Sequence, residues 1–426
     1  NMVDIEAKSF RFDKKIEAFL HKLADDLRTS RYRPGPVRRF EIPKPNNPSK
    51  TRPIVVLTLA DRIVHTALKL LLEPLVEARL AKSCFGFRPG RSRYDQMFAV
   101  RRLVEHESPR FTAALATDIA SCFDQLDHAA IRRELRQVTS DGELLQLLEQ
   151  VLLQVGQGQT GWWRKRRVGI LQGSALSPLL ANLTLATFDR EWSRKHATTA
   201  PAFRYADDLL ILAQDIAEGQ LLQKQLVRCL WETNRLELAE DKTHVVTFQA
   251  GVPLLGMQLQ EQHGPFDDES HVRILWDVLK VRACLTSIDE WAQSLTANRS
   301  LGRQFAEINR RLWGWFATYQ YAFNAPQAFE AIDRRVFQAT RARLKVILSN
   351  SSTKIAAEHH VRLRSGHESW QCDGEVLLVL SSLARKAYCP KRQRLPWDMK
   401  LRDPREFSAS TPSPESLVMP SSPSLE

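Results

Sequence analysis

The chain has 426 residues, which is long for a single hydrophobic core and predicts two or three domains. A hydrophobic share of 43%, a charged share of 26% and the lack of any apolar run of membrane-spanning length indicate a soluble globular protein rather than a membrane protein. The formal net charge of +12 favours a polyanionic partner. Six cysteines without CxxC pairs indicate reduced thiols in a cytosol rather than a disulfide framework or a zinc knuckle.

The first half of the chain mixes helical and extended patterns. Apolar residues at helical spacing predict a short amphipathic helix over 1–30, and six prolines favour extended segments over 31–57. "FTAALATDI" (111–119) predicts a buried strand with a carboxylate, Asp118, at its exit. "AFRYADDLLILA" (202–213) predicts two short strands joined by a turn that carries two aspartates.

From about residue 272 the pattern changes to long helices. Within them cations interleave with aromatic residues, a pattern that can follow a duplex backbone, at Arg310, Arg311, Trp313, Trp315, Tyr319, Arg334 and Arg335. The alternative is that Trp313, Phe316 and Tyr319, at helical spacing, face the core. Residues 351–405 are basic and less regular, with no role assigned, and 406–426 form a Ser/Pro-rich tail that is predicted to be disordered.

Three aspartates define the candidate site. If the two strand regions are neighbours, Asp118, Asp207 and Asp208 bring three negative charges to one sheet edge, where like charges raise each other's pKa. Divalent cations remove this conflict, and carboxylate oxygens suit Mg²⁺. Two such ions about 4 Å apart activate an attacking hydroxyl and stabilise a leaving phosphate oxygen, which predicts phosphoryl transfer. The alternative is a surface turn with two solvated aspartates.

Several motifs, in order, resemble those of reverse transcriptases: "TDIASCFDQLDH", "LQGSALSPLLANLTLATFD" and "YADD". More narrowly, "IPKPNNPSKTRPIVVLTLADRIVHTAL" and "SCFGFRPGRSRYDQM" resemble the fingers motifs of group II intron reverse transcriptases, also called maturases, and their bacterial relatives. "RRLWGWFATYQYAF" and the helix after it resemble that family's thumb, or domain X. The resemblance to the fingers and palm motifs runs from about residue 30 to 260.

The resemblance implies an α+β, right-hand polymerase with fingers, an antiparallel-sheet palm and a helical thumb. Fingers and palm would occupy 1–260, with the fingers mainly over 1–110 and 130–160, the palm mainly over 111–129 and 161–260, and the thumb over 272–350. The implied activity is RNA-directed DNA polymerisation with two Mg²⁺ ions, for which Mn²⁺ can substitute, an RNA template, a DNA or RNA primer and dNTPs. The alternative is a maturase that promotes folding and splicing of an intron or other structured noncoding RNA.

Family roles carry over to matching positions of this chain. The resemblance implies metal ligands at Asp118, Ile119, Asp207 and Asp208, and a proton donor to the leaving pyrophosphate at Lys242. It implies nucleotide contacts at Lys50, Arg52, Phe123, Gln172 and Gly173, with Phe123 as the steric gate against ribonucleotides. It implies template or primer contacts at Arg88, Arg91, Leu255, Gly256, Arg310 and Arg311. The alternatives are a core phenylalanine at Phe123, a solvated lysine at Lys242 and a structural arginine at Arg88.

The C-terminal region lacks the residues of a nuclease domain. Cys372 and Cys389 stand alone, and His359 with His360 lacks metal-ligand spacing, so no HNH endonuclease is expected. Relatives without a nuclease occur in retroelements, beside CRISPR spacer acquisition and in phage defence. The sequence does not choose among these settings.

Overall fold

The computed structural model describes residues 14–44, 47–106, 110–154, 156–157, 163–164, 168–263, 270–348, 358–363 and 365–383. The chain divides into two compact units. The first unit comprises Asn1–Arg88, Thr117–Ile211 and Gln220–His244, and the second comprises Pro89–Ala116, Leu212–Gly219 and Val245–Glu426. The segment Pro89–Ala116 is grouped with the C-terminal elements in the second unit. No described helix is long and apolar enough to cross a membrane.

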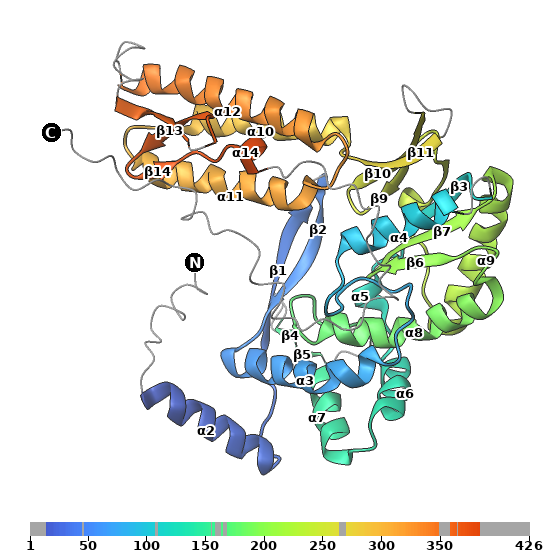
Figure 1. Ribbon diagram of the computed structural model, residues 1–426. Coiled ribbons are helices and arrows are strands. Elements are labelled where there is room, and N and C mark those ends of the chain that lie inside the picture. The colour runs from blue at the N-terminus through green and yellow to red at the C-terminus, as the bar shows by residue number, and fades with distance from the viewer. Residues whose placement is uncertain are drawn as a thin grey trace. The chain divides into compact units, whose positions relative to one another are not determined.

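Helices and one hairpin sheet build most of the first unit (Figure 1). Its helices are α2 (Lys14–Arg28), α3 (Leu59–Glu77), α5 (Cys122–Gln125), α6 (His128–Val138), α7 (Gly142–Leu152), α8 (Ser177–His196) and most of α9 (Ile216–Asn234). Its hairpin sheet has the order β2-β1-β4-β5, from β1 (Val37–Lys44), β2 (Asn47–Val56), β4 (Gly156–Gln157) and β5 (Trp163–Arg164). The proline-rich stretch is therefore extended, as predicted.

A second four-stranded sheet carries the aspartates. Its order is β6-β7-β3-β8, from β3 (Ala113–Asp118), β6 (Ala202–Tyr205), β7 (Asp208–Ala213) and β8 (His244–Thr247). Strands β3 and β7 are buried at every position except Asp118 and Asp208, which explains their continuous apolar runs. The strands predicted around 111–119 and 202–213 are confirmed. The polar end of each of these two strands is an aspartate.

The second unit contains the long C-terminal helices (Figure 1). They are α10 (Val278–Ser294), α11 (Leu301–Tyr319) and α12 (Ala325–Leu348), accompanied by α4 (Arg93–His106) and α14 (Leu380–Leu383). Two small sheets join them, one of β9 (Val252–Leu254), β10 (Met257–His263) and β11 (Ser270–Leu275), the other of β12 (His360–Arg362), β13 (Glu368–Cys372) and β14 (Glu375–Val376). The described residues after 357 thus include strands and a short helix. Trp370 of β13 anchors them to α12, because its buried indole donates to the Phe337 carbonyl at 3.0 Å.

Aromatic rings form the core between α11, α12 and β11. The Trp276 ring stacks on Tyr319 with centroids 3.9 Å apart, and Phe316 lies 5.6 Å from Phe329. Phe316 is buried and Tyr319 half-buried. For these two residues the structure supports the core interpretation of the helical aromatic pattern.

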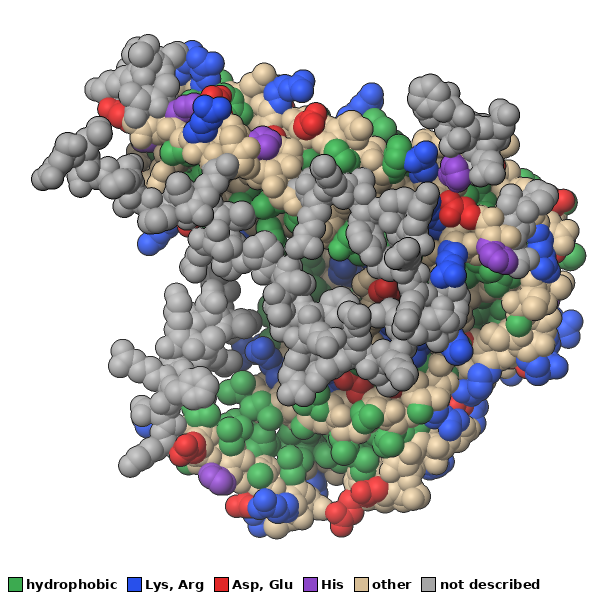
Figure 2. Space-filling model, in the orientation of Figure 1, with side chains coloured by type: hydrophobic (Ala, Val, Ile, Leu, Met, Phe, Trp, Pro, Cys, Tyr) green, Lys and Arg blue, Asp and Glu red, His purple; other side chains and the backbone are tan. Residues whose placement is uncertain are grey.

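Helix α3 is apolar on both of its faces. Its inner face buries Val64, Leu68, Leu72 and Val76. On its outer face Leu70, Leu71 and Leu75 are 63%, 56% and 45% exposed. Figure 2 shows the resulting cluster of hydrophobic side chains over this helix. Only the inner face contributes to the core of the first unit.

A buried ion pair fastens β6 to α8 in the first unit. The Arg204 guanidinium donates from Nε to Asp189 Oδ1 at 2.9 Å and from Nη1 to Asn182 Oδ1 at 2.9 Å, and Arg204 is only 1% exposed. Burial acts to lower the pKa of Arg204, but the attraction of Asp189 outweighs it and the pKa is raised. The buried guanidinium therefore depends on its ion pair with Asp189.

Removing one partner of this pair should destabilise the fold strongly. Arg204→Gln leaves the Asp189 carboxylate buried without a cation, which should lower the free energy of unfolding by about 3–5 kcal/mol. The matched control is Arg194→Gln, which breaks an exposed pair with Glu191 on the same helix and should leave the unfolding midpoint unchanged. Urea denaturation followed by tryptophan fluorescence measures both variants. Equal effects would contradict the prediction.

Candidate active site

The turn between β6 and β7 lies against the exit of β3. The amide of Ile119 donates to the Asp207 carbonyl at 3.0 Å, so the backbone after Asp118 is bonded directly to the aspartate turn. On the other side of Asp118, its carbonyl accepts from the Ala239 amide at 2.8 Å, just before the short helix η1 (Glu240–Lys242). The fold thus places Asp118, Asp207 and Asp208 at one edge of the sheet.

A close backbone approach shapes this turn. Ala206 has a left-handed conformation with φ of 59°. Gly86 lies so near that a Cβ on it would be 2.4 Å from the Ala206 nitrogen, a distance that no side chain tolerates. The Asn182 amide donates to the Gly86 carbonyl at 2.7 Å and holds the approach in place. This contact explains why glycine stands in the "GFRPG" stretch.

Arg204 connects the buried ion pair to the same turn. Its Nη1 donates to the Ala206 carbonyl at 3.1 Å as well as to Asn182. Sequence reasoning missed Arg204, Asp189 and Asn182. A charged residue inside a short strand next to two aspartates was the available signal, because a buried cation needs a partner.

The carboxylates of the site sit in different environments. Burial, together with the smaller effect of the charge on Asp207, raises the pKa of Asp208 to about 6. The Asp118 carboxylate instead forms an ion pair with Lys242 Nζ. Among the described residues, no three His, Cys, Asp or Glu side chains are placed to hold a metal ion as they stand. The carboxylate oxygens of the three aspartates nevertheless suit a hard cation. A bound cation would stabilise the ionised form of Asp208, which burial and Asp207 disfavour.

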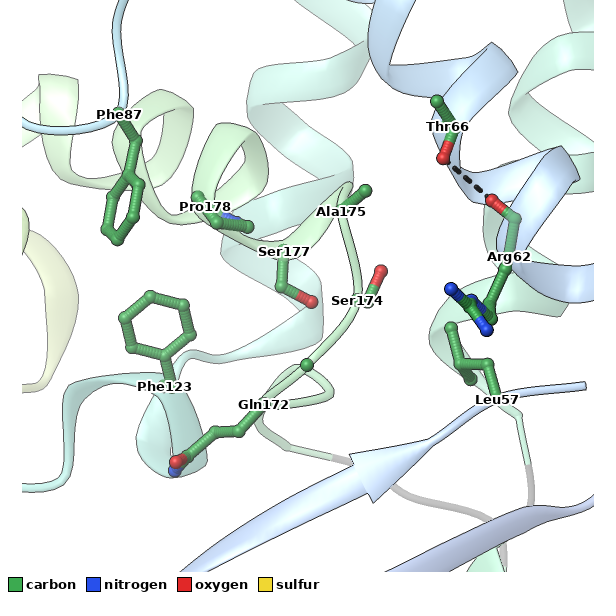
Figure 3. A pocket seen from close by; sticks show the side chains of 11 residues that line it. Leu57, Arg62, Thr66, Phe87, Phe123, Gln172, Ser174, Ala175, Ser177 and Pro178 are labelled. Carbon is green, nitrogen blue, oxygen red and sulfur yellow. Dashed lines mark hydrogen bonds between the residues drawn. The ribbon is translucent and has the colours of Figure 1, made fainter. Parts of the chain in front are cut away.

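A pocket of about 520 Å³ opens beside α5 in the first unit. Three predicted nucleotide-binding residues, Phe123, Gln172 and Gly173, line it. Its other lining residues are Leu57, Arg62, Thr66, Phe87, Ser174, Ala175, Ser177 and Pro178. Figure 3 shows the Phe87 and Phe123 rings on one side and the side chains of Arg62 and Thr66 on the other. The pocket is therefore aromatic at one end and polar and cationic at the other.

The loop that contains Gln172 and Gly173 is held by β2 and α5. The Val55 amide donates to the Gln172 carbonyl at 2.7 Å, and the Gln172 side-chain amide donates to Asp124 at 2.9 Å. Gly173 has φ of 115°, and a Cβ on it would lie 2.5 Å from the Val55 carbonyl oxygen. The close approach that requires glycine here is thus to β2, and a contact with a base remains a prediction.

Arg62 is a pocket residue that sequence reasoning missed. It is exposed on α3, and its guanidinium has no hydrogen bond or ion pair within the described ranges. The neighbouring Asp61 is buried and bonded to Tyr32 and Gln154. The adjacent Asp61 and Arg62 at the start of an apolar helix were the available signal in the sequence. An unpaired guanidinium in a pocket suits a phosphate.

The other basic residues predicted for the first unit have different surroundings. Arg52 is exposed on β2, opposite Ile42 of β1. Lys50 lies on the same strand, but its side chain is outside the part that the structure describes. Arg88 is 8% exposed and donates from Nε to Glu77 at 2.9 Å and from Nη1 to the carbonyls of Ala81 and Cys84. Arg88 therefore has the structural role that was its alternative interpretation.

The remaining predicted residues belong to the second unit. Leu255 and Gly256 form the β9–β10 turn with positive φ angles of 48° and 87°, and Lys280 Nζ donates to the Gly256 carbonyl at 2.8 Å. Arg310 and Arg311 are exposed on α11. Arg91 is half-buried ahead of α4. The structure does not test their contacts with a template or primer.

Comparison with known proteins identifies the family. The model of the reverse transcriptase (RNA-dependent DNA polymerase) family matches residues 42–259. Protein YkfC of Escherichia coli K12 is 29% identical over 277 residues, which cover 58% of this chain and 72% of YkfC. The group II intron-encoded protein LtrA of Lactococcus lactis is 32% identical over 174 residues, 41% of this chain and 28% of LtrA. A structure of telomerase from Candida albicans with a fragment of telomeric RNA has a TM-score of 0.46 and 13% identity, and covers 78% of this chain and 63% of that one.

The family match covers half of the chain, and the chain belongs to the reverse transcriptase family. The predicted resemblance to group II intron-encoded proteins is confirmed by LtrA. The predicted enzyme class, an RNA-directed DNA polymerase with maturase activity as the alternative, and the mixed α and β polymerase fold are confirmed with it.

The electrostatic conflict at Asp208 should be visible in stability measurements without divalent ions. Because its pKa is raised from 3.8 to about 6, the folded state loses stability as the pH rises between these values, and the loss is complete above the higher one. In EDTA, Asp208→Asn should therefore raise the thermal midpoint at about pH 8, and the gain should vanish by about pH 4. Glu232→Gln, at an exposed position on α9, is the control and should show no such pH-dependent gain. If the wild type were as stable as Asp208→Asn at the higher pH, ionised Asp208 would not destabilise the metal-free protein, and the prediction would be wrong.

Proposed function

We propose that this chain extends the 3′-hydroxyl of a DNA or RNA primer along an RNA template, with dNTPs as substrates and two divalent ions as cofactors. The observation that carries this proposal is the placement of three aspartates at one sheet edge, with the pocket residue Phe123 five residues after the first of them, Asp118. The family match over residues 42–259 supports it. The five described cysteines are buried thiols outside any disulfide, which is consistent with a reducing cytosol.

Asp118, Asp207 and Asp208, with the backbone of Ile119, would hold two Mg²⁺ ions, for which Mn²⁺ can substitute. Such ions activate an attacking hydroxyl and stabilise charge on a leaving phosphate oxygen. To take part, the Asp118 carboxylate has to leave its ion pair with Lys242. The released Lys242 ammonium group can then donate a proton to the leaving pyrophosphate. The ion pair therefore keeps a general acid beside the site until it is needed.

The pocket supports a nucleotide site. Phe123 would occupy the space of a ribose 2′-hydroxyl, while Gln172 and Gly173 would lie against the new base pair. Lys50 and Arg52 of β2 would contact the triphosphate, because guanidinium and ammonium groups suit phosphate oxygens. Arg91, the Leu255–Gly256 turn and the exposed Arg310 and Arg311 of the second unit would contact template or primer. Electrostatic contacts of this kind make binding strongly salt-dependent.

Substitution of one aspartate tests the chemistry. Asp207→Asn removes one ligand charge and should lower primer extension on an RNA template by more than about 100-fold at saturating Mg²⁺. Glu232→Gln is the control for an exposed acid and should extend at the wild-type rate. Extension is measured with a labelled primer, dNTPs and Mg²⁺. Unchanged extension by Asp207→Asn would refute the assignment, and tight binding of one intron RNA without any extension by the wild type would favour the maturase alternative.

Substitution of the ring in the pocket tests the sugar gate. Phe123→Ala removes the group that would clash with a 2′-hydroxyl, so incorporation of ribonucleotides relative to deoxynucleotides should rise by about 10- to 100-fold. The control is Phe87→Ala, which truncates the other aromatic ring on the same side of the pocket (Figure 3) and should leave this ratio unchanged. Single-nucleotide incorporation with matched dNTP and rNTP gives the ratio. A similar change in both variants would mean that Phe123 only shapes the pocket.

A further inference from the structure

The turn between α11 and α12 presents aromatic side chains to solvent. Tyr321 and Phe323 are 41% and 49% exposed, while the intervening Ala322 is 3% exposed. Packing for stability alone would favour the opposite arrangement, with the large rings buried and the small residue outside. A cluster of exposed aromatic rings is a common mark of a binding surface.

This turn is held firmly by β11 and by Trp276, which follows that strand. The Asn324 side chain accepts from the Trp276 amide at 2.7 Å and donates to the Trp276 carbonyl at 2.8 Å. The Phe323 amide donates to the Ile274 carbonyl at 2.7 Å. The exposed rings therefore stand on a fixed backbone, which reduces the entropy lost when a ligand binds.

Helix α4 supplies further rings to the same surface. The Tyr94 ring meets Tyr321 edge-on with centroids 4.6 Å apart, and Phe98 meets Tyr321 edge-on at 6.3 Å. The Tyr94 hydroxyl donates to the Ala317 carbonyl at 3.0 Å, which fixes α4 to the end of α11. Tyr94, Phe98 and Tyr321 thus form one ring cluster from two segments that are far apart in the sequence.

Two arginines lie over these rings. The guanidinium carbon of Arg273 is 3.8 Å from the centroid of Phe323, and that of Arg93 is 5.3 Å from the centroid of Tyr94. Neither forms an ion pair with a carboxylate within the described part of the chain. Both positive charges are thus available to a ligand, and cations stacked on aromatic faces are a feature of surfaces that bind unpaired bases.

We propose that this aromatic patch, formed by Arg93, Tyr94, Phe98, Arg273, Tyr321 and Phe323, binds unpaired RNA by base stacking. The choice of RNA rests on the proposed function, in which an RNA template enters the enzyme. The unpaired arginines and the net charge of +12 favour a polyanion over a protein partner. Unpaired bases expose the π-faces that stack on aromatic rings, whereas bases inside a duplex do not.

Binding of a single-stranded oligoadenylate tests the patch. Tyr321→Ala, Phe323→Ala and Arg273→Ala should each weaken binding of the single strand by about 5- to 100-fold and binding of the same strand in a duplex much less. The control is Trp231→Ala on α9, which removes another exposed ring with an arginine, Arg235, 5.4 Å above it. Fluorescence anisotropy at fixed salt measures each affinity. A loss equal for single strand and duplex, or equal to that of the control, would overturn the proposal.

Three further measurements separate the patch from the proposed function, from misfolding and from a protein contact. Ultraviolet crosslinking of wild-type protein to the oligoadenylate should label the peptides that contain Tyr94 or Tyr321, and labelling only elsewhere would refute the site. Incorporation of one nucleotide on a primed template whose overhang is a single templating base should be unchanged in the patch variants, because no long unpaired strand is then needed. If the wild type extends no primer while the patch variants still lose single-strand binding, the polymerase proposal fails and the patch stands. Unchanged RNA binding with altered self-association in sedimentation would assign the patch to a protein contact and overturn the RNA proposal.

Discussion

The arrangement of the active site depends on one buried guanidinium. Arg204 is paired with Asp189, bonded to Asn182 and bonded to the Ala206 carbonyl, so a single side chain ties helix α8, strand β6 and the aspartate turn together. A buried cation is stable only when its donors are satisfied. The geometry of the turn is therefore set by the requirement to satisfy this charge. The position of the two adjacent aspartates follows from that of the turn.

The aspartates themselves make the opposite contribution to stability. Asp208 is partly buried and lies next to the charge of Asp207. The negative charge of Asp118 is balanced by its ion pair with Lys242. Such a site holds electrostatic repulsion in the free protein, and divalent cations would convert that repulsion into binding energy. The same carboxylates that cost stability are the groups that the proposed chemistry requires. Lower folding stability is common at residues that are retained for their function.

Close backbone contacts complete the site. Gly86 approaches the aspartate turn and Gly173 approaches β2, and at either position a Cβ would overlap a backbone atom. Both positions require glycine because a Cβ there would overlap the protein's own backbone, so contact with a substrate is not needed to explain them. The pocket beside α5 therefore owes its shape to the packing of β2 and the 171–174 loop, together with the rings of Phe87 and Phe123. Chemistry and packing select the same residues here.

Patterns along the chain determined the strands around 111–119 and 202–213, the long helices after 272, the aspartate trio and the class of enzyme, because periodicity and motif order are properties of neighbouring residues. Only the tertiary structure decided which cations are free and which are structural. Arg88 forms an ion pair with Glu77, and Arg62 lines the pocket. Lys242 forms an ion pair with Asp118, which is 124 residues away in the sequence. Burial and long-range pairing decide the role of a charged side chain, and a linear sequence contains neither directly.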